Sequence, residues 1–382
     1  MKYFYIISNI FISITFANKD LENFYLNKGI NDLYNYNFDS SLSYLDSAIY
    51  INPKNPIPYF VKISAKWLNS QVNISFEESH KTILSELNLI IPFYEKLINN
   101  DPKIPENYLY LGSAYGLQAR IHLAKKKWID VIWSGLKGLN NIKISKKLNP
   151  DLHDVLVPIG MMEYFISLTP KPMQMLSSIM GMPPDRENGL KKLYFAYNNS
   201  DYSWIESGFV LSHAYLHFEN QIKLAEEITY KLTNEFPGNP NFIYMYAECI
   251  LRSNQLKKFE LLMEELKSKP EDYPSIQRKI CLIKYNYLMS IYHYRRGELD
   301  TSITYLKYVI DNYQMEMDWL LGYSFYMLGK IYDLKFEREQ AKYYYEKVVE
   351  LNNLFLYQNW AMEYLKLPFF DLNNDPMFIL NK

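Results

Sequence analysis

The sequence predicts an all-α protein in which about eight pairs of helices stack along the chain and one capping helix follows them. Three observations lead to this prediction: glycine is scarce, one spacing of apolar and small residues recurs, and proline-containing segments separate the recurrences. Only 13 of the 382 residues are glycine, about half of what an average usage of roughly 7% would give. Sandwiches, barrels and nucleotide-binding loops need glycine for turns and close backbone approach, so its scarcity argues against them.

The overall composition also limits the choice of partners. Hydrophobic residues make up 48% of the chain and charged residues 22%, so the chain has enough apolar material for a sizeable core. The formal net charge is -1, which provides no overall basic surface for nucleic acid or an anionic membrane. We therefore expect no nucleic-acid partner.

Residues 1–17 have the character of a secretory signal peptide. Lys2 precedes a mostly apolar stretch over 3–15, and Ala17 is the small residue directly before the expected cleavage site. The alternative is that this stretch is the first helix of the array. We expect cleavage near Ala17, a mature chain that begins at Asn18 and has no integral membrane segment, and a periplasmic or extracellular location.

One spacing of residues recurs around a central glycine. The clearest unit comprises Phe325, Leu328, Gly329, Tyr332, Ala341, Tyr345 and Val348; the same spacing gives Tyr108, Leu111, Gly112, Tyr115, Ala124, Trp128 and Val131, and in part Gly29, Ser41, Leu45, Ala48 and Pro53. A small residue at the glycine position lets the first helix of a pair touch the second, whose small residue 12 positions later is expected to face it. This is the pattern of the tetratricopeptide (TPR) repeat, and the chain resembles that family over most of its mature length.

Further units follow the same rhythm less closely. Small or medium-sized residues at the facing position recur at Gly189, Ala225, Phe259, Ser302 and Ala341. Proline-containing segments at 52–56, 101–105, 149–151 and 236–240 are expected to end second helices, because proline cannot continue a helix. Residues 57–100 are expected to form a pair whose long second helix is interrupted by Pro92.

The resemblance implies a right-handed α-solenoid. Its expected repeats cover 18–56, 57–103, 104–150, 151–200, 201–239, 240–272, 273–311 and 312–352. The segment 353–382 is expected to form a capping helix followed by an extended end that shields the last repeat.

An insertion over 168–190 departs from the family pattern. It is rich in proline and methionine, and Asp185 is placed to cap the helix that follows. Its residues GMPPDRENGLKKL resemble a GFxGDRxxGLxxL passage in the inclusion-body-clearance branch of TPR-related proteins. This resemblance supports the helical-repeat architecture and implies no function. The insertion provides adaptable apolar surface for a hydrophobic ligand, a membrane edge or a partner helix, with packing across repeats as the alternative. The methionines concerned are Met173, Met175, Met180 and Met182.

Signatures of catalysis are absent from the sequence. It contains no GxxxxGK[ST], GxGxxG, GxSxG, HExxH or CxxC motif, and we predict no catalytic residue, no cofactor and no metal site. His213 and His217 stand one helical turn apart and could share an ion with Glu219 or Glu206, but the repeat register favours packing for both rings.

Two further groups of residues call for an interpretation. Glu163 follows an apolar stretch and is expected to pair with an Arg or Lys of a neighbouring helix, for instance Arg120. Cys249 and Cys281 fall in expected helix interiors, so two buried thiols are favoured over a bridge.

The concave groove of the array is the expected binding surface. The positions that point inward on first helices hold Leu109, Ser113, Gly116, Val210, Ala214, His217, Tyr244, Glu248, Leu251, Tyr287, Ile291, Tyr294, Tyr326, Lys330 and Asp333, with Arg252 and Arg295 at the edge. Tyrosine combines contact area with a polar tip and suits a peptide groove. The expected partner-binding residues are Tyr244, Glu248, Arg252, Tyr287, Tyr294, Arg295, Tyr326 and Lys330, with Met173, Met175 and Met180 as possible insertion contacts. The alternative is that half of the tyrosines pack between repeats.

The sequence therefore predicts a non-enzymatic, exported scaffold that binds a protein or peptide partner through its concave face without a cofactor. One alternative is a ligand-handling accessory subunit of an envelope transport system. A second is an enzyme that uses Glu163 or His217 in a cavity under the insertion.

Overall fold

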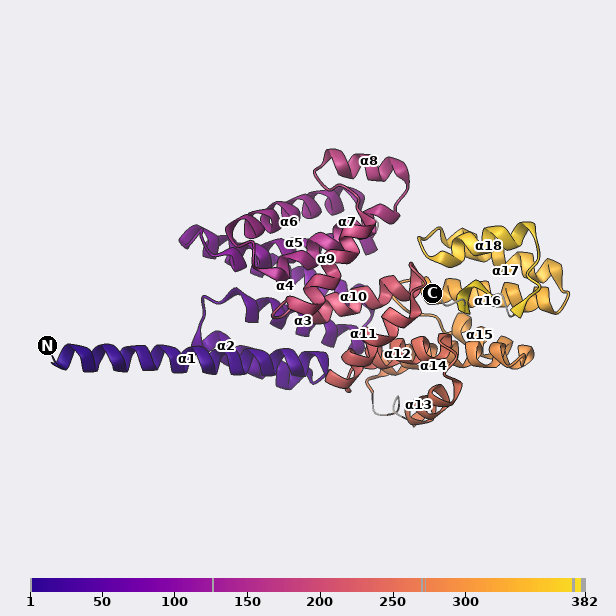
Figure 1. The fold of residues 1–382 in the computed structure, drawn as a ribbon, viewed down its shortest axis with the longest axis horizontal. Coiled ribbons are helices and arrows are strands. Elements are labelled where there is room, and N and C mark those ends of the chain that lie inside the picture. Colours follow the sequence, from indigo (N-terminus) through magenta and orange to yellow (C-terminus); the bar gives the residue numbers. More distant parts are fainter. Residues whose placement is uncertain (1, 126, 269–270, 272, 373–374, 379–382) are drawn as a thin grey trace. The chain divides into compact units, whose positions relative to one another are not determined.

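The computed structural model describes residues 2–125, 127–268, 271, 273–372 and 375–378, with side chains described throughout except at 2–17, 128 and 268. Across these ranges helices are the only regular secondary structure (Figure 1). The chain divides into two compact units, residues 1–159 and residues 160–382, and α7 runs through the boundary between them.

The N-terminal unit consists of helices that follow each other in sequence order. They are α1 (Lys2–Tyr34), α2 (Phe38–Ile51), α3 (Pro56–Asn73), α4 (Phe76–Asn100), α5 (Pro105–Ala124), α6 (Trp128–Leu148) and the short η1 (His153–Val155), followed by the start of α7 (Leu156–Leu168).

The C-terminal unit also consists of helices. Its further helices are α8 (Lys171–Ile179), α9 (Arg186–Asn199), α10 (Trp204–His217), α11 (Ile222–Glu235), α12 (Pro240–Arg252), α13 (Leu256–Ser268), α14 (Ser275–Arg295), α15 (Leu299–Asp311), α16 (Trp319–Leu334), α17 (Arg338–Leu351), α18 (Leu356–Lys366) and η4 (Pro376–Phe378).

Within the described residues the helices form eight consecutive pairs, α1/α2, α3/α4, α5/α6, α7/α9, α10/α11, α12/α13, α14/α15 and α16/α17, and α18 packs on the last pair. This confirms the prediction of an all-α array of TPR-like helix pairs with a C-terminal capping helix. The insertion forms α8, a short helix between the two members of one pair.

The proline-containing segments follow the ends of second helices, as predicted: α2 ends at Ile51, α4 at Asn100 and α11 at Glu235. Pro56, Pro105 and Pro240 each occupy the first position of a helix, where the missing N–H breaks no hydrogen bond. The Asp185 side chain accepts a hydrogen bond from the amide of Asn188 at 3.0 Å, so the predicted cap of α9 is confirmed.

Small residues let paired helices approach closely. A Cβ added to Gly112 would lie 2.8 Å from the carbonyl oxygen of Gly138, and one on Gly160 would lie 2.8 Å from that of Gly189. In the first repeat the Ser41 hydroxyl donates to the Gly29 carbonyl at 2.7 Å, which is the predicted contact 12 positions apart.

The facing residue predicted for Gly112 is wrong. Ala124 is the last residue of α5, the same helix that carries Gly112, and it is exposed. Because α5 runs longer than the first helix of a regular repeat, the small residue opposite Gly112 is Gly138 on α6.

The interruption predicted at Pro92 is also wrong. Helix α4 continues through Pro92 to Asn100. Ile91 and Tyr94 on either side are buried, and the Tyr94 hydroxyl donates to the Pro56 carbonyl at 3.0 Å. Tertiary packing therefore offsets the hydrogen bond that proline removes.

Several turns inside the pairs share a left-handed backbone residue. These residues, each between the first and second helix of a pair, are Tyr36 (φ 63°), Asn220 (53°), Asn254 (62°), Gly297 (75°) and Phe336 (61°). Only one of them is glycine, although this backbone region favours glycine. The turns therefore share this backbone conformation, although glycine indicates it in the sequence at only one of the five positions.

Cys249 and Cys281 are free and buried, as predicted. Burial raises the pKa of the Cys281 thiol to about 12.

Met1 and the side chains of residues 2–17 lie outside what the structure describes, so the signal peptide stays a prediction. Among the described residues, no helix combines the length and apolar character that a membrane crossing requires.

The close contact at Gly112 makes a testable prediction. We expect Gly112→Ala to lower the free energy of unfolding by about 1–3 kcal/mol, because the added methyl group meets backbone of α6 that has little room to move. Thermal unfolding followed by circular dichroism measures the change. Gly116→Ala is the matched control, one turn further along α5, where a Cβ meets nothing within 4 Å. It should leave stability unchanged or raise it by up to about 1 kcal/mol; equal losses for the two variants would contradict the close-contact explanation.

Candidate functional site

The first helices α10, α12, α14 and α16 of the C-terminal unit carry most of the predicted groove residues, and we call the surface they form the inner face. Tyr244 and Glu248 lie on α12 and are 4% and 3% exposed. Arg252, Tyr287, Tyr294, Tyr326 and Lys330 are at most 1% exposed, and Arg295 is partly exposed. The structure thus brings the predicted residues together, but it buries them.

Aromatic contacts across the inner face explain part of this burial. The ring of His217 on α10 lies 4.6 Å from that of Trp319 and 5.7 Å from that of Tyr323, both on α16. Next to them, Phe218 stacks on Phe355 at 4.8 Å, just before α18. Helices that are three pairs apart along the chain therefore meet through their side chains.

A small cavity remains beside these rings. Its volume is about 30 Å³, and Phe209, His213, Asn241, Tyr244, Met245, Glu248, Lys284, Tyr287, Leu288, Trp319 and Leu320 line it. The Tyr244 hydroxyl finds no partner within the described residues. A cavity needs roughly 10–15 Å³ of such volume to hold one water, so this cavity has room for a few water molecules.

Arg252 makes several hydrogen bonds on the inner face. Its guanidinium group donates to the carbonyl oxygen of Leu216 at 2.9 Å and to the side-chain oxygen of Asn220 at 2.8 Å. Glu248, one turn earlier, lies 3.4 Å away, and burial raises the pKa of its carboxyl group against the opposing effect of Arg252. The fourth partner of Arg252 is the carbonyl oxygen of Met377, at 3.1 Å, near the C-terminal end of the chain.

Lys330 is a second buried cation, fully enclosed by aromatic rings. Its ammonium group lies 4.5 Å from the ring centroid of Tyr326 and 4.8 Å from that of Tyr294, and the rings of Phe369 and Phe378 lie at 5.5 and 5.9 Å. Ring faces attract a cation, most strongly away from water. Burial lowers the pKa of Lys330, and its ion pair with Asp375 opposes that shift.

The C-terminal segment Asp375–Phe378 covers this part of the inner face. The Asp375 carboxylate pairs with Lys330 and accepts a hydrogen bond from the Tyr294 hydroxyl at 2.8 Å. Asn220 donates to the Pro376 carbonyl at 3.1 Å. Met377 is fully buried, and the guanidinium group of Arg295 lies over the Phe378 ring at 4.5 Å. The prediction of an extended end is wrong for residues 376–378, which form the 3-10 helix η4. The segment reaches past the last repeat to Arg252 on α12 and to Asn220 in the turn after α10.

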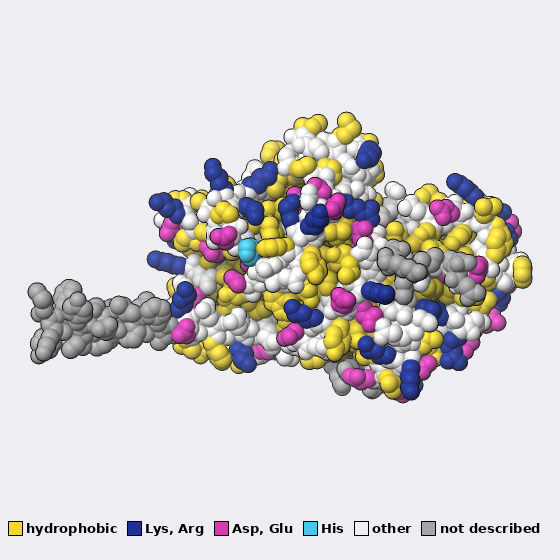
Figure 2. Space-filling model, in the orientation of Figure 1, with side chains coloured by type: hydrophobic (Ala, Val, Ile, Leu, Met, Phe, Trp, Pro, Cys, Tyr) yellow, Lys and Arg dark blue, Asp and Glu magenta, His cyan; other side chains and the backbone are white. Residues whose placement is uncertain are grey.

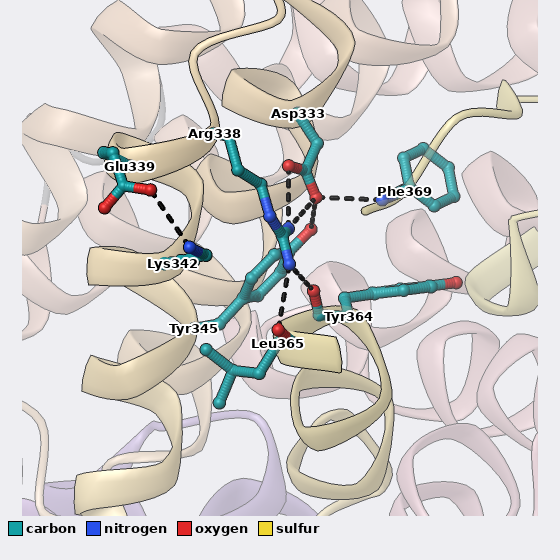
Figure 3. A network of polar contacts seen from close by, with 8 residues as sticks. All are labelled: Asp333, Arg338, Glu339, Lys342, Tyr345, Tyr364, Leu365 and Phe369. Atoms are coloured by element: carbon teal, nitrogen blue, oxygen red, sulfur yellow. Dashed lines mark hydrogen bonds and ion pairs between the residues drawn. The ribbon is translucent and has the colours of Figure 1, made fainter. Parts of the chain in front are cut away.

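A polar network centred on Asp333 holds the chain that leads to this segment (Figure 3). Arg338 binds both carboxylate oxygens of Asp333, at 2.9 and 3.0 Å, and donates to the carbonyls of Tyr364 and Leu365 at the end of α18. The amide of Phe369 donates to Asp333 at 2.8 Å. The network thereby ties α16 and α17 to the end of α18 and to the chain that follows it.

The remaining site candidates have other surroundings. Glu163 pairs with Lys192 on α9, so the predicted cation from a neighbouring helix is confirmed. Arg120, named in the sequence analysis as one example of such a cation, has its guanidinium group over the Trp67 ring at 4.6 Å. Among the described residues, no group of three His, Cys, Asp or Glu side chains could hold a metal ion. The rings of His213 and His217 instead pack against Trp319, as the repeat register predicts.

The methionine-rich insertion presents apolar side chains to solvent. On α8, Met173 is 48% exposed, Met175 68% and Ile179 83%. Figure 2 shows hydrophobic side chains gathered over α8, at the top of the view. Met180 at the end of α8 is partly buried.

The chain was compared with proteins of known structure and with known protein families. The chain is similar to the solved structure of the human IFIT1 dimer with PPP-AAAA, with 14% identity, 91% of this chain and 84% of that chain covered, and a TM-score of 0.42. It is similar to the P58(IPK) TPR domain, with 14% identity, coverage of 87% and 84%, and a TM-score of 0.24. It is also similar to yeast Tom70, with 10% identity, coverage of 91% and 95%, and a TM-score of 0.26. No protein-family model and no curated protein sequence matches the chain.

Sequence reasoning missed the residues that complete the inner face from a distance. Asn220 lies in a turn, and Asp375 lies near the end of the chain, so neither belongs to the repeat template. The one available signal was the sequence Asp-Pro-Met-Phe at 375–378, which combines a carboxylate with apolar residues.

Two histidines on α10, the buried His217 and the partly buried His213, predict an acid-sensitive C-terminal unit. Burial lowers the pKa of His213 to about 4 and that of His217 well below 6.5, the ordinary histidine value. Between about pH 6.5 and pH 4 the unfolded chain binds protons that the folded chain does not, so the free energy of unfolding falls as the pH falls through this range.

We expect the decrease to reach at most about 1.4 kcal/mol per pH unit for each histidine. His217→Phe keeps a ring beside Trp319 and removes the titrating nitrogens, so it should make the pH dependence shallower. Urea unfolding at pH 7.5, 5.5 and 4.5 measures the slopes; equal slopes for the two chains would show that His217 does not contribute.

Proposed function

We propose that this chain is a non-enzymatic scaffold that binds a protein or peptide partner through the inner face of its C-terminal unit. We further propose that the mature chain is exported by cleavage near Ala17 and works in the periplasm or outside the cell. It needs no cofactor and no nucleic acid for this role.

One observation carries the proposal: the inner face already holds a short polypeptide segment from a distant part of the chain, Asp375–Phe378, which includes the 3-10 helix η4. Asn220 and Arg252 donate to the main-chain carbonyls of Pro376 and Met377, at 3.1 Å each. Peptide-binding grooves commonly combine main-chain hydrogen bonds, which provide affinity, with side-chain pockets, which provide selectivity. The rings around Met377 and Phe378 form such pockets here.

Site-specific photo-cross-linking tests this function. A photoreactive phenylalanine analogue replaces Arg295 or Lys284 on the inner face, and the chain is irradiated in its own cells. Tyr50, which lies in the N-terminal unit and is 88% exposed, is the control position. We expect one defined partner to be cross-linked from positions 295 and 284 and not from 50. The same products from all three positions would contradict a specific inner-face interaction.

The insertion favours a second candidate function, that of an accessory subunit that handles an apolar ligand on α8. The specific observation is the exposure of Met173, Met175 and Ile179 on this helix. In this case native mass spectrometry of freshly purified protein shows a co-purifying small molecule, and Met175→Ser reduces its amount. A cross-linker at Ile179 reports a protein partner at the same helix, so the two uses of α8 are separable.

A further inference from the structure

The segment Asp375–Phe378 occupies the inner face in the manner of a bound peptide. Its partners on the array lie far away in sequence: Arg252 is 125 residues from Met377, and Asn220 is 156 residues from Pro376. It is attached to the array by its main chain, by one buried carboxylate and by two apolar side chains. These are the three types of contact that a groove makes with a peptide ligand.

The inner face depends on this segment for its charge balance. Lys330 is fully buried, and Asp375 supplies its carboxylate. Removing one partner of a buried ion pair leaves an uncompensated charge, which is strongly unfavourable. With the segment displaced, this position attracts another carboxylate. The three rings that remain, of Tyr294, Tyr326 and Phe369, select a neighbouring apolar chain.

The chain that leads to the segment is only partly fixed on the surface. After α18, Phe369 is buried and held by Asp333, whereas Leu367 is 71% and Phe370 74% exposed. Asp375–Phe378 is therefore a short anchored stretch at the end of a connection with exposed side chains. Its release breaks the contacts described above without unfolding a helix pair.

We infer that the site formed by Asn220, Arg252, Tyr294 and Lys330 binds a partner segment in which a carboxylate is followed by apolar residues, and that Asp375–Phe378 is an intramolecular ligand which the partner must displace. This inference rests on the proposed peptide-binding function and specifies the chemistry of the partner. A tethered ligand competes at a high effective concentration. A chain whose own segment Asp375–Phe378 occupies the site therefore has a reduced apparent affinity for free peptide.

A peptide-binding experiment on the full chain tests this inference. The probe is a fluorescent peptide with the sequence of residues 371–378, DLNNDPMF, and the readout is fluorescence anisotropy. We expect Asp375→Asn to increase the affinity for this peptide by about tenfold or more, because the variant releases its own segment. Asp371→Asn is the matched control, the same charge change at an exposed residue of the chain that leads to the segment. It should bind the peptide as weakly as the unaltered chain.

The peptide itself provides the test of selectivity. DLNNNPMF, with asparagine in place of the residue that corresponds to Asp375, should bind the Asp375→Asn chain about tenfold more weakly than DLNNDPMF, because it cannot pair with Lys330. Adding Lys330→Gln to that chain should abolish the difference between the two peptides. Equal binding of both peptides before Lys330 is changed would overturn the inference.

Hydrogen exchange on the unaltered chain tests displacement without a substitution. The amides of Met377 and Phe378 donate to Asp375 at 3.0 Å each. Saturating DLNNDPMF should accelerate their exchange while the amides of α16 stay protected. Continued protection of both would show that the segment is a fixed cap and would overturn the inference. If the amides stay protected but a partner is still cross-linked from position 295, only the displacement inference fails and the proposed function stands. If the cross-link is absent as well, the proposed function also fails.

Discussion

Two fully buried cations, Arg252 and Lys330, determine how the inner face of the C-terminal unit is built. A buried charge needs hydrogen-bond acceptors or an opposite charge close by. Arg252 obtains them from helix α10, from Glu248 and from Met377, and Lys330 obtains them from its aromatic rings and Asp375. These requirements connect helices α10 and α12 to the last residues that the structure describes.

The same constraint explains part of the use of tyrosine. The chain has 36 tyrosines, and three in the C-terminal unit fill space with the ring while the hydroxyl group lies next to a buried carboxylate. Tyr294 donates to Asp375, Tyr345 donates to Asp333, and Tyr287 lies at 3.4 Å from Glu248. A phenylalanine would fill the same volume but would leave these buried carboxylates with fewer donors.

The helix pairs were predictable because their signals are local. Proline at the start of α5, the Asp185 cap and the small residue at Gly29 all act within one pair. The errors at Pro92 and Ala124 arose where packing or helix length overrides a local rule. The inner face was predictable as a set of residues, but its covering was not: contacts such as His217 with Trp319 or Asn220 with Pro376 join distant parts of the chain, and no spacing rule reports them.

The contact between Phe218 and Phe355 has a consequence for cooperativity. In a simple repeat array each pair touches only its neighbours, so stability is a sum of local terms and the ends unfold first. Here the pair that contains α10 also touches side chains of α16 and of the chain before α18. Fraying of the C-terminal end therefore removes support from a pair in the interior of the sequence. The C-terminal unit is consequently expected to melt in a single transition, as a closed globular domain does, and not repeat by repeat.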